Sequence, residues 1–106
     1  MLRRFTWTLG LIVVGTVQVF SANGADAFGE GKILYGQFCQ RCHGHELVST
    51  GASTFDLRTF PKGERDRFVS SVSNGIDSMP PHGDILSSAE INALYAYVTA
   101  MQAQPK

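Results

Sequence analysis

Cysteine is scarce in this chain of 106 residues, in which Cys39 and Cys42 are the only two. A disulfide between them would close a very small loop, so it would add little to stability. An excess of charge of one sign is also lacking, because nine Lys and Arg residues balance nine Asp and Glu residues. Without a basic patch or a basic tail, we exclude nucleic acid as a partner.

Strand patterns and long apolar runs are absent as well. No alternation of apolar and polar residues reaches a useful length, and the chain contains neither internal repeats nor low-complexity tracts. The apolar run over residues 5–20 is shorter than the ~20 residues that a membrane-spanning helix requires, and Gly10 and Gly15 interrupt it. We therefore expect a helical domain.

The N-terminal residues have the order of a secretory signal peptide. Residues 3–4 give a positive start, residues 5–20 supply the apolar segment, and residues 25–27 form an A-x-A cleavage site. We predict that residues 1–27 are a signal peptide cleaved after Ala27, and that the mature protein is periplasmic. The alternative is an uncleaved segment retained as a membrane anchor.

Residues 28–106 then form a single small domain. A core of this size rarely provides more than ~3–5 kcal/mol of stability, so such domains usually need a disulfide, a metal or a large cofactor. Because cysteine pairing adds little here, a bound metal or cofactor is favoured.

One motif can hold such a cofactor. The string Cys39-Gln40-Arg41-Cys42-His43 has the Cys-x-x-Cys-His pattern for covalent attachment of c-type haem. A short helical turn places both thiols along one haem edge, where they form thioethers with the vinyl groups, and the next residue brings its imidazole under the iron. The spacing predicts one covalently bound haem c.

Two other kinds of site compete for these residues. A thioredoxin-like redox pair needs a βαβ context, and no such pattern is present. A zinc site needs further ligands at a familiar spacing; His45 and His82 could complete a Cys2His2 set, but their positions match none. The haem interpretation is therefore preferred.

The apolar periodicity predicts three helices. They cover residues 28–43, residues 63–74 and the segment from position 87 to near the C-terminus. A loop is expected over residues 44–61, and a turn-rich segment over residues 76–84.

Local signals indicate where these helices end and which faces they bury. Gly75 is expected to end the second helix. Ser87 and Glu90 form a capping box, and Leu86 can pack on Ile91 as a hydrophobic staple. The side chains expected to be buried are Ile33, Leu34, Tyr35 and Phe38 in the first helix, Phe68, Val69 and Val72 in the second, and Ile91, Leu94, Tyr95 and Val98 in the third.

Residues 28–101 resemble the class I c-type cytochromes. Beside the haem motif, Gly31 and Tyr35 lie upstream of it, and Leu94 and Tyr97 lie in the final helix. In that family such residues allow the first and last helices to cross closely. The resemblance implies an all-α fold of three to four helices around one covalent haem, and a one-electron carrier rather than an enzyme.

The resemblance also implies two axial iron ligands, His43 and Met79. Met79 lies in the turn-rich segment, and the two prolines after it limit the freedom of the backbone. His82, Met101 and an open site stay as alternatives for the distal position. His45 is too close to His43 to reach the opposite haem face.

Further pocket residues are expected from the resemblance. Arg58 is a candidate partner for a haem propionate, the alternative being a solvated surface arginine. The mixed-sign run over residues 62–67 is interpreted as a solvated helix start. The apolar side chains expected to line the haem are Leu57, Phe60, Phe68 and Ile76.

A narrower resemblance concerns partners. Residues 54–58 (Thr-Phe-Asp-Leu-Arg), 60–61 (Phe-Pro), 74–75 (Asn-Gly) and 79–81 (Met-Pro-Pro) are similar to cytochromes that serve quinoprotein alcohol dehydrogenases. This similarity implies a PQQ-containing dehydrogenase as electron donor, and an oxidase or another cytochrome as acceptor. The competing functions are a haem enzyme or gas sensor, which needs an open distal face, and a tightly bound dehydrogenase subunit.

One departure from the family concerns the axial histidine. Many class I members have a proline shortly after the haem motif, and its carbonyl accepts a hydrogen bond from that histidine. Residues 44–60 contain no proline. Another backbone carbonyl must therefore orient His43, because a metal-bound imidazole normally donates its second N–H.

Overall fold

The structure, a computed structural model, describes residues 10–16, 25–49, 51 and 54–104. Its elements are α1 (Ala25–Phe38), α2 (Gln40–His43), the 3-10 helices η1 (His45–Leu47) and η2 (Leu57–Thr59), α3 (Arg65–Asn74) and α4 (Ser88–Gln102). No strand occurs in this described part, which contains only an isolated bridge between Ile76 and Met79. The predicted all-α fold is confirmed.

The predicted signal peptide is only partly covered. Residues 1–9 and 17–24 lie outside the described residues, whereas residues 10–16 have no helix or strand and are exposed. None of the helices in the described ranges combines the length and the apolar content needed to span a bilayer. Helix α1 begins at Ala25, so the predicted cleavage after Ala27 would fall within its first turn.

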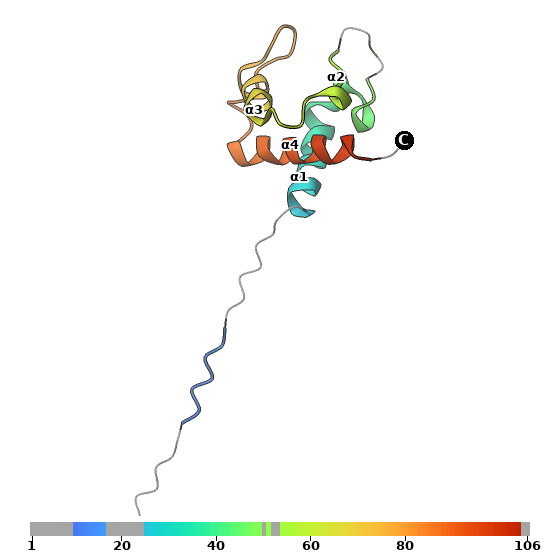
Figure 1. The fold of residues 1–106 in the computed structure, drawn as a ribbon. Coiled ribbons are helices and arrows are strands. Elements are labelled where there is room, and N and C mark those ends of the chain that lie inside the picture. The colour runs from blue at the N-terminus through green and yellow to red at the C-terminus, as the bar shows by residue number, and fades with distance from the viewer. Residues whose placement is uncertain (1–9, 17–24, 50, 52–53, 105–106) are drawn as a thin grey trace, which may run out of the picture.

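The domain is organised around a close crossing of α1 and α4. In Figure 1, α1 crosses α4, and α2 and α3 lie on the upper side of α4. A Cβ atom at Gly31 would lie 2.1 Å from the Ala93 carbonyl oxygen and 2.8 Å from the Tyr97 Cβ. Only glycine therefore fits where the two backbones meet, as the resemblance to the class I family implied.

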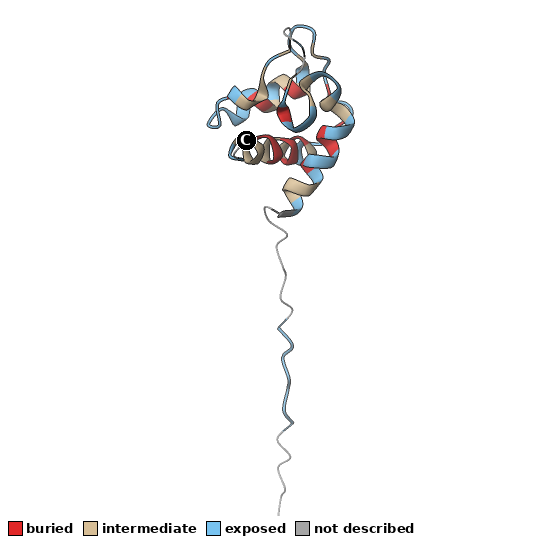
Figure 2. Cartoon of the chain, turned by 90° about the vertical axis from the view of Figure 1, so that its right-hand side faces the viewer, coloured by how far each residue is buried: buried red, intermediate tan, exposed pale blue. Residues whose placement is uncertain are grey.

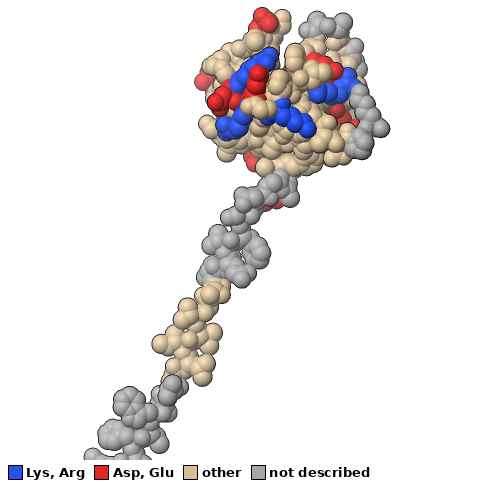
Figure 3. Space-filling view, in the orientation of Figure 1, with Lys and Arg blue, Asp and Glu red and all other residues tan. Residues whose placement is uncertain are grey.

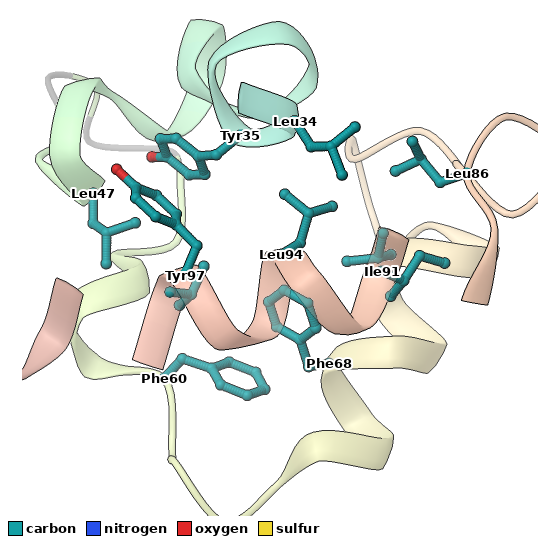
Figure 4. Close-up of a cluster of buried hydrophobic side chains, with 11 residues drawn as sticks. Leu34, Tyr35, Leu47, Phe60, Phe68, Leu86, Ile91, Leu94 and Tyr97 are labelled. Carbon is teal, nitrogen blue, oxygen red and sulfur yellow. The ribbon is translucent and has the colours of Figure 1, made fainter. Parts of the chain in front are cut away.

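Aromatic side chains fill the rest of this crossing. The ring centroid of Tyr97 lies 5.1 Å from that of Tyr35 and 5.3 Å from that of Phe28. Figure 4 shows the Tyr35 and Tyr97 rings next to each other, with Leu34 and Leu94 beside them. Tyr35 is almost fully buried, and its hydroxyl donates to the Gly44 carbonyl at 2.5 Å. The crossing is thus connected directly to the residue after the Cys-x-x-Cys-His motif.

Helices α3 and α4 begin and end close to where their local signals indicated. Helix α3 ends before Gly75, which has a φ of 76°. At the start of α4, the Ser87 Oγ accepts from the Glu90 N–H at 3.2 Å, and the Glu90 carboxylate accepts from the Ser87 N–H at 2.9 Å. The predicted capping box is therefore confirmed, and Leu86 and Ile91 are both buried in the same core cluster.

Helix α4 contains more of the buried residues than any other helix, as Figure 2 shows. The predicted positions Ile91, Leu94 and Val98 of α4 are buried; Ala93 and Tyr97 are buried as well, whereas Tyr95 is only partly buried. In α1 the prediction for Ile33 is wrong, since this side chain is 64% exposed. The remaining predicted core positions are buried or packed against the core.

Two predicted element boundaries also differ from the structure. The helix expected over residues 28–43 is interrupted at Cys39, which separates α1 from α2. The loop expected over residues 44–61 contains η1 and η2, and its Leu47 is fully buried at a left-handed φ of 67°. A left-handed leucine costs roughly 1–2 kcal/mol, so burial in the core must hold it there.

Candidate functional site

Two adjoining cavities open beside the Cys-x-x-Cys-His motif. Their volumes are about 290 and 310 Å³. The first is lined mainly by apolar side chains of η2, α3 and α4, and the second reaches toward the surface at Cys42 and Pro80. The residues that line both cavities are Cys39, His43, Phe55, Ile76, Asp77 and Met79. The motif and the predicted distal residue therefore share one site.

The motif residues are held on a single tight turn. The Cys39 N–H donates to the Tyr35 carbonyl at 2.9 Å, and the His43 N–H donates to the Cys39 carbonyl at 2.9 Å. Gly44 ends the turn at a φ of 87°, where a Cβ would lie 1.8 Å from the Val48 carbonyl oxygen. This backbone presents the thiols and the imidazole to the same site.

Both cysteines are free thiols. Cys39 is half-buried and lines both cavities, whereas Cys42 is exposed and lines the second. Burial, and secondarily the charge of Cys42, raises the pKa of the Cys39 thiol to about 11. Cys39 is therefore a neutral, protonated thiol at neutral pH. Among the residues that the structure describes, no three His, Cys, Asp or Glu side chains converge into a metal-binding group.

The carbonyl that faces the His43 ring belongs to Phe55. The His43 Nδ1 lies 3.2 Å from the Phe55 carbonyl oxygen. Burial lowers the pKa of His43, and the Phe55 carbonyl partly offsets this effect. A neutral imidazole with its proton on Nδ1 donates this hydrogen bond and leaves Nε2 as a lone-pair donor. The backbone carbonyl expected to face the His43 ring is therefore that of Phe55, which the sequence pattern alone did not single out for this contact.

Met79 lies in a tight turn that follows α3. The Ile76 N–H donates to the Met79 carbonyl at 3.2 Å, and the Met79 N–H donates to the Ile76 carbonyl at 2.9 Å. Asp77 adopts a φ of 51° between them. A Cβ at Gly75 would lie 2.6 Å from the Met79 carbonyl oxygen and 2.9 Å from the Pro81 nitrogen. Gly75 therefore both ends α3 and leaves room for the Met79 turn.

The far end of this loop is bonded back to α3. The N–H of His82 donates to the Val72 carbonyl at 2.8 Å, and the N–H of Gly83 donates to the Ser73 carbonyl at 3.0 Å. The His82 ring lies edge-on to Phe38, and its Nδ1 is buried with no hydrogen-bond partner among the described residues. His82 lines only the second cavity, whereas Met79 lines both.

Some of the other candidate residues lie away from the cavities, whereas others line them. Neither Met101, which packs against the core, nor the exposed His45 lines either cavity within the described part. Arg58 is also absent from both linings, and its guanidinium donates to the Asp56 carboxylate at 2.9 and 2.8 Å. The four apolar residues expected to line the haem all line the first cavity; they are Leu57, Phe60, Phe68 and Ile76.

One cavity residue was not anticipated. Arg67, predicted to be part of a solvated helix start, lines the first cavity with its guanidinium carbon 5.3 Å from the centroid of the Phe60 ring. It also pairs with Glu64 at 2.7 Å. Arg67 lies four residues before Ser71 on α3, so both side chains lie on the helix face that borders this cavity. Figure 3 shows that acidic and basic residues alternate over the visible face of the domain.

Comparison with known proteins gives two matches. Residues 26–98 match the family model described as cytochrome c oxidase, cbb3-type, subunit III. The quinohemoprotein alcohol dehydrogenase ADH IIB of Pseudomonas putida is 36% identical over 75 residues, which represent 68% of this chain and 11% of that relative. The chain thus matches only a small part of the length of this relative. No solved structure matches the chain.

Proposed function

Because the chain belongs to the c-type cytochrome family described as cytochrome c oxidase, cbb3-type, subunit III, we propose that it is a periplasmic one-electron carrier for a quinoprotein alcohol dehydrogenase. Membership of this family implies covalently bound haem c and a role in electron transfer with redox partners. The site residues, the partner and the location belong to the proposal.

The residues around the cavities fit a haem. The walls are largely apolar, and each of the two adjoining cavities lies at the lower limit of the volumes found for ligand sites. Cys39 and Cys42 would form the thioethers, and His43 and Met79 would be the axial ligands. Bound haem c supplies a one-electron ferric–ferrous couple. The observation that carries the proposal is that the Cys39 thiol, the His43 imidazole and the Met79 thioether line the same two cavities.

The chain's own groups suit a carrier of fairly high potential. Burial lowers the pKa of His43 and so favours the neutral imidazole, while the hydrogen bond to the Phe55 carbonyl orients the ring. Met79 would add a soft, uncharged thioether, which gives a higher potential than a second histidine does. The apolar lining formed by Phe60, Phe68 and their neighbours would give a bound haem a largely apolar environment. With both axial positions filled, such a site transfers electrons without binding a substrate.

The rim of the site offers a docking surface for a redox partner. Phe55 is 50% exposed and Ile76 is 54% exposed, and both line the cavities. Pro80 is also exposed beside the second cavity. These side chains support a small, transient interface of the kind that weak electron-transfer complexes form.

The identity of the donor is supported by the relative and by the residues that resemble such cytochromes. The printed name of that relative describes a quinohemoprotein alcohol dehydrogenase, and the match covers 11% of it. The resembling residues 54–58 and 79–81 lie at the site, since Phe55, Leu57 and Met79 line its cavities. A dehydrogenase would pass electrons to this chain, which would pass them toward a terminal oxidase.

The proposal is tested with the purified, haem-loaded protein and a PQQ-containing alcohol dehydrogenase. After addition of an alcohol, we expect the dehydrogenase to reduce the cytochrome in stopped-flow absorbance measurements. A nicotinamide-dependent alcohol dehydrogenase is the control and should give no reduction. If ascorbate reduces the cytochrome but the quinoprotein does not, the proposed donor is wrong, whereas the electron-transfer role stands.

A further inference from the structure

The last residue of α4 makes two hydrogen bonds to a segment far away in the sequence. The Gln102 Nε2 donates to the Leu57 carbonyl at 2.7 Å and to the Phe60 carbonyl at 2.8 Å. These two carbonyls belong to the first residue of η2 and to the residue that follows its end. Gln102 thereby fixes both ends of η2 to the most buried helix of the domain.

The η2 segment is itself tightly bonded, so that it can move only as a unit. The Asp56 carboxylate accepts from the Arg58 N–H at 3.0 Å and from the Arg58 guanidinium at 2.9 and 2.8 Å. The Thr59 hydroxyl donates to the Asp56 carbonyl at 2.8 Å. A force that fixes Leu57 and Phe60 therefore also fixes the backbone at Asp56.

The carbonyl that faces His43 comes immediately before this unit. Phe55 precedes Asp56, and its carbonyl oxygen lies 3.2 Å from the His43 Nδ1. The Phe55 side chain is half exposed, so burial of its ring provides only part of its anchorage. On its N-terminal side, the Thr54 N–H donates a long hydrogen bond of 3.5 Å to the Gly51 carbonyl. The firmer support of the Phe55 carbonyl is η2.

We propose that Gln102 is a positioning residue for the axial histidine, which it controls through η2 and the Phe55 carbonyl. The proposal rests on the assignment of His43 as an axial ligand in the function proposed above. A strong hydrogen bond from Nδ1 makes an imidazole a better electron donor, which favours ferric iron. Loss of the Gln102 contacts weakens that hydrogen bond and shifts the couple toward ferrous iron.

The test uses Gln102→Met in the haem-loaded protein, because methionine keeps the length of the side chain and removes the donor. In equilibrium with a redox mediator, we expect the ratio of reduced to oxidised protein to rise by up to about tenfold. A tenfold change corresponds to 59 mV for a one-electron couple. In the NMR spectrum of the ferrous protein, the His43 ring N–H should exchange with solvent faster than in the wild type.

Two controls separate positioning from general loss of stability. Gln104→Met changes an exposed glutamine two residues further on and should alter neither quantity. Ile91→Val removes one methyl group from the buried opposite end of α4 and should lower the unfolding temperature while the redox equilibrium stays unchanged. If Ile91→Val shifts the equilibrium as much as Gln102→Met does, Gln102 has a merely structural role and the inference is overturned.

A shorter amide gives a second test if the methionine variant does not accumulate. Gln102→Asn retains the donor but shortens its reach, so we expect a shift in the same direction that is smaller than that of the methionine variant. An unchanged redox equilibrium and an unchanged His43 N–H exchange rate in Gln102→Asn would contradict the inference. If the wild-type protein itself lacks the spectrum of a histidine-ligated haem, the ligand assignment of the proposed function has failed instead.

Discussion

Different contacts hold His43 and Met79 in place. His43 has its backbone bonded to Cys39 and its ring hydrogen-bonded to Phe55. Met79 is fixed through its main chain by the reciprocal hydrogen bonds with Ile76, whereas its partly buried side chain packs against the core and lines the cavities. The Met79 side chain can therefore be replaced without loss of the turn that carries it.

Replacement of Met79 by alanine tests the distal ligand. We expect Met79→Ala to lower the reduction potential, because the iron loses a ligand that favours the ferrous state. The reduced variant should also bind carbon monoxide, which absorbance spectroscopy detects. Met101→Leu is the control, because Met101 packs against the core and should leave both properties unchanged.

Either of two results would change the distal assignment. If Met79→Ala leaves the potential and the carbon monoxide affinity as in the wild type, Met79 is not the ligand. If His82→Ala, rather than Met79→Ala, makes the reduced protein bind carbon monoxide, the distal ligand is His82, which lines the second cavity.

At the residue scale, the sequence predicted the groups of the Cys-x-x-Cys-His motif but not the contacts that position them. The thiols and the imidazole were recognisable because they are neighbours in the chain, with a spacing that has a chemical meaning. The Phe55 carbonyl was not, because every residue has a carbonyl and only the fold decides which one faces His43. The Gln102 contacts with Leu57 and Phe60 connect residues about 40 positions apart, which no local pattern reveals.

At the scale of helices, local sequence signals predicted where a helix begins or ends better than they predicted which of its sides is buried. Gly75 and the Ser87–Glu90 box act within a few residues, so they correctly indicated the end of α3 and the start of α4. Which face of α4 is buried depends on the helix that crosses it. Tyr97 is buried against α1, whereas Tyr95 is only partly buried. Helix η1 was missed because the burial of Leu47 depends on the tertiary core.

The crossing of α1 and α4 gives a matched pair of glycine variants. Gly31→Ala should lower the free energy of unfolding by about 1–3 kcal/mol, because the methyl group would overlap Ala93 and Tyr97. Gly29→Ala, whose Cβ would meet no described atom within 4 Å and which lies at the predicted start of the mature chain, should leave it nearly unchanged. Urea denaturation followed by circular dichroism measures both changes, and equal effects of the two would contradict the role of Gly31.

The start of α4 can be tested in the same way. Ser87→Ala removes the acceptor for the Glu90 N–H and should cost about 1 kcal/mol of stability. Ser88→Ala, one residue further on and exposed, should have little effect. A Ser87→Ala variant as stable as the wild type in the same denaturation assay would show that the cap contributes nothing measurable.

For the molecule as a whole, the first cavity lies within the hydrophobic core. Residues that surround the first cavity include Tyr35, Phe68, Leu94 and Val98, all of which are also buried core residues. A cavity of about 290 Å³ within so small a core deprives these side chains of contacts. The haem would supply those contacts, so folding and cofactor attachment should be coupled.

Removal of both thiols tests this coupling. We expect the double variant Cys39→Ser, Cys42→Ser to lack covalent haem on a haem-stained denaturing gel. Its far-ultraviolet circular dichroism should be that of a largely unfolded chain, because the apolar cavity stays unfilled. A variant without haem that retained the helical spectrum and a cooperative unfolding transition would show that the polypeptide folds by itself.

The predicted export of the protein is also a property of the whole chain. Expressed in a bacterium with its haem-attachment machinery, the mature protein should begin at Phe28 and be recovered from the periplasm. Intact-mass measurement and N-terminal sequencing check this expectation. A haem-loaded protein that retains residues 1–27 and sediments with membranes would instead support the retained anchor.

The crowding at Gly75 has a consequence for sorting relatives of this chain. A side chain at this position cannot coexist with the observed course of the backbone past Met79 and Pro81. Any homologue that carries a larger residue here must route the loop that corresponds to residues 76–81 differently, even when its methionine aligns. The glycine is therefore a better marker than the methionine for deciding in which homologues this loop can be compared with the one described here.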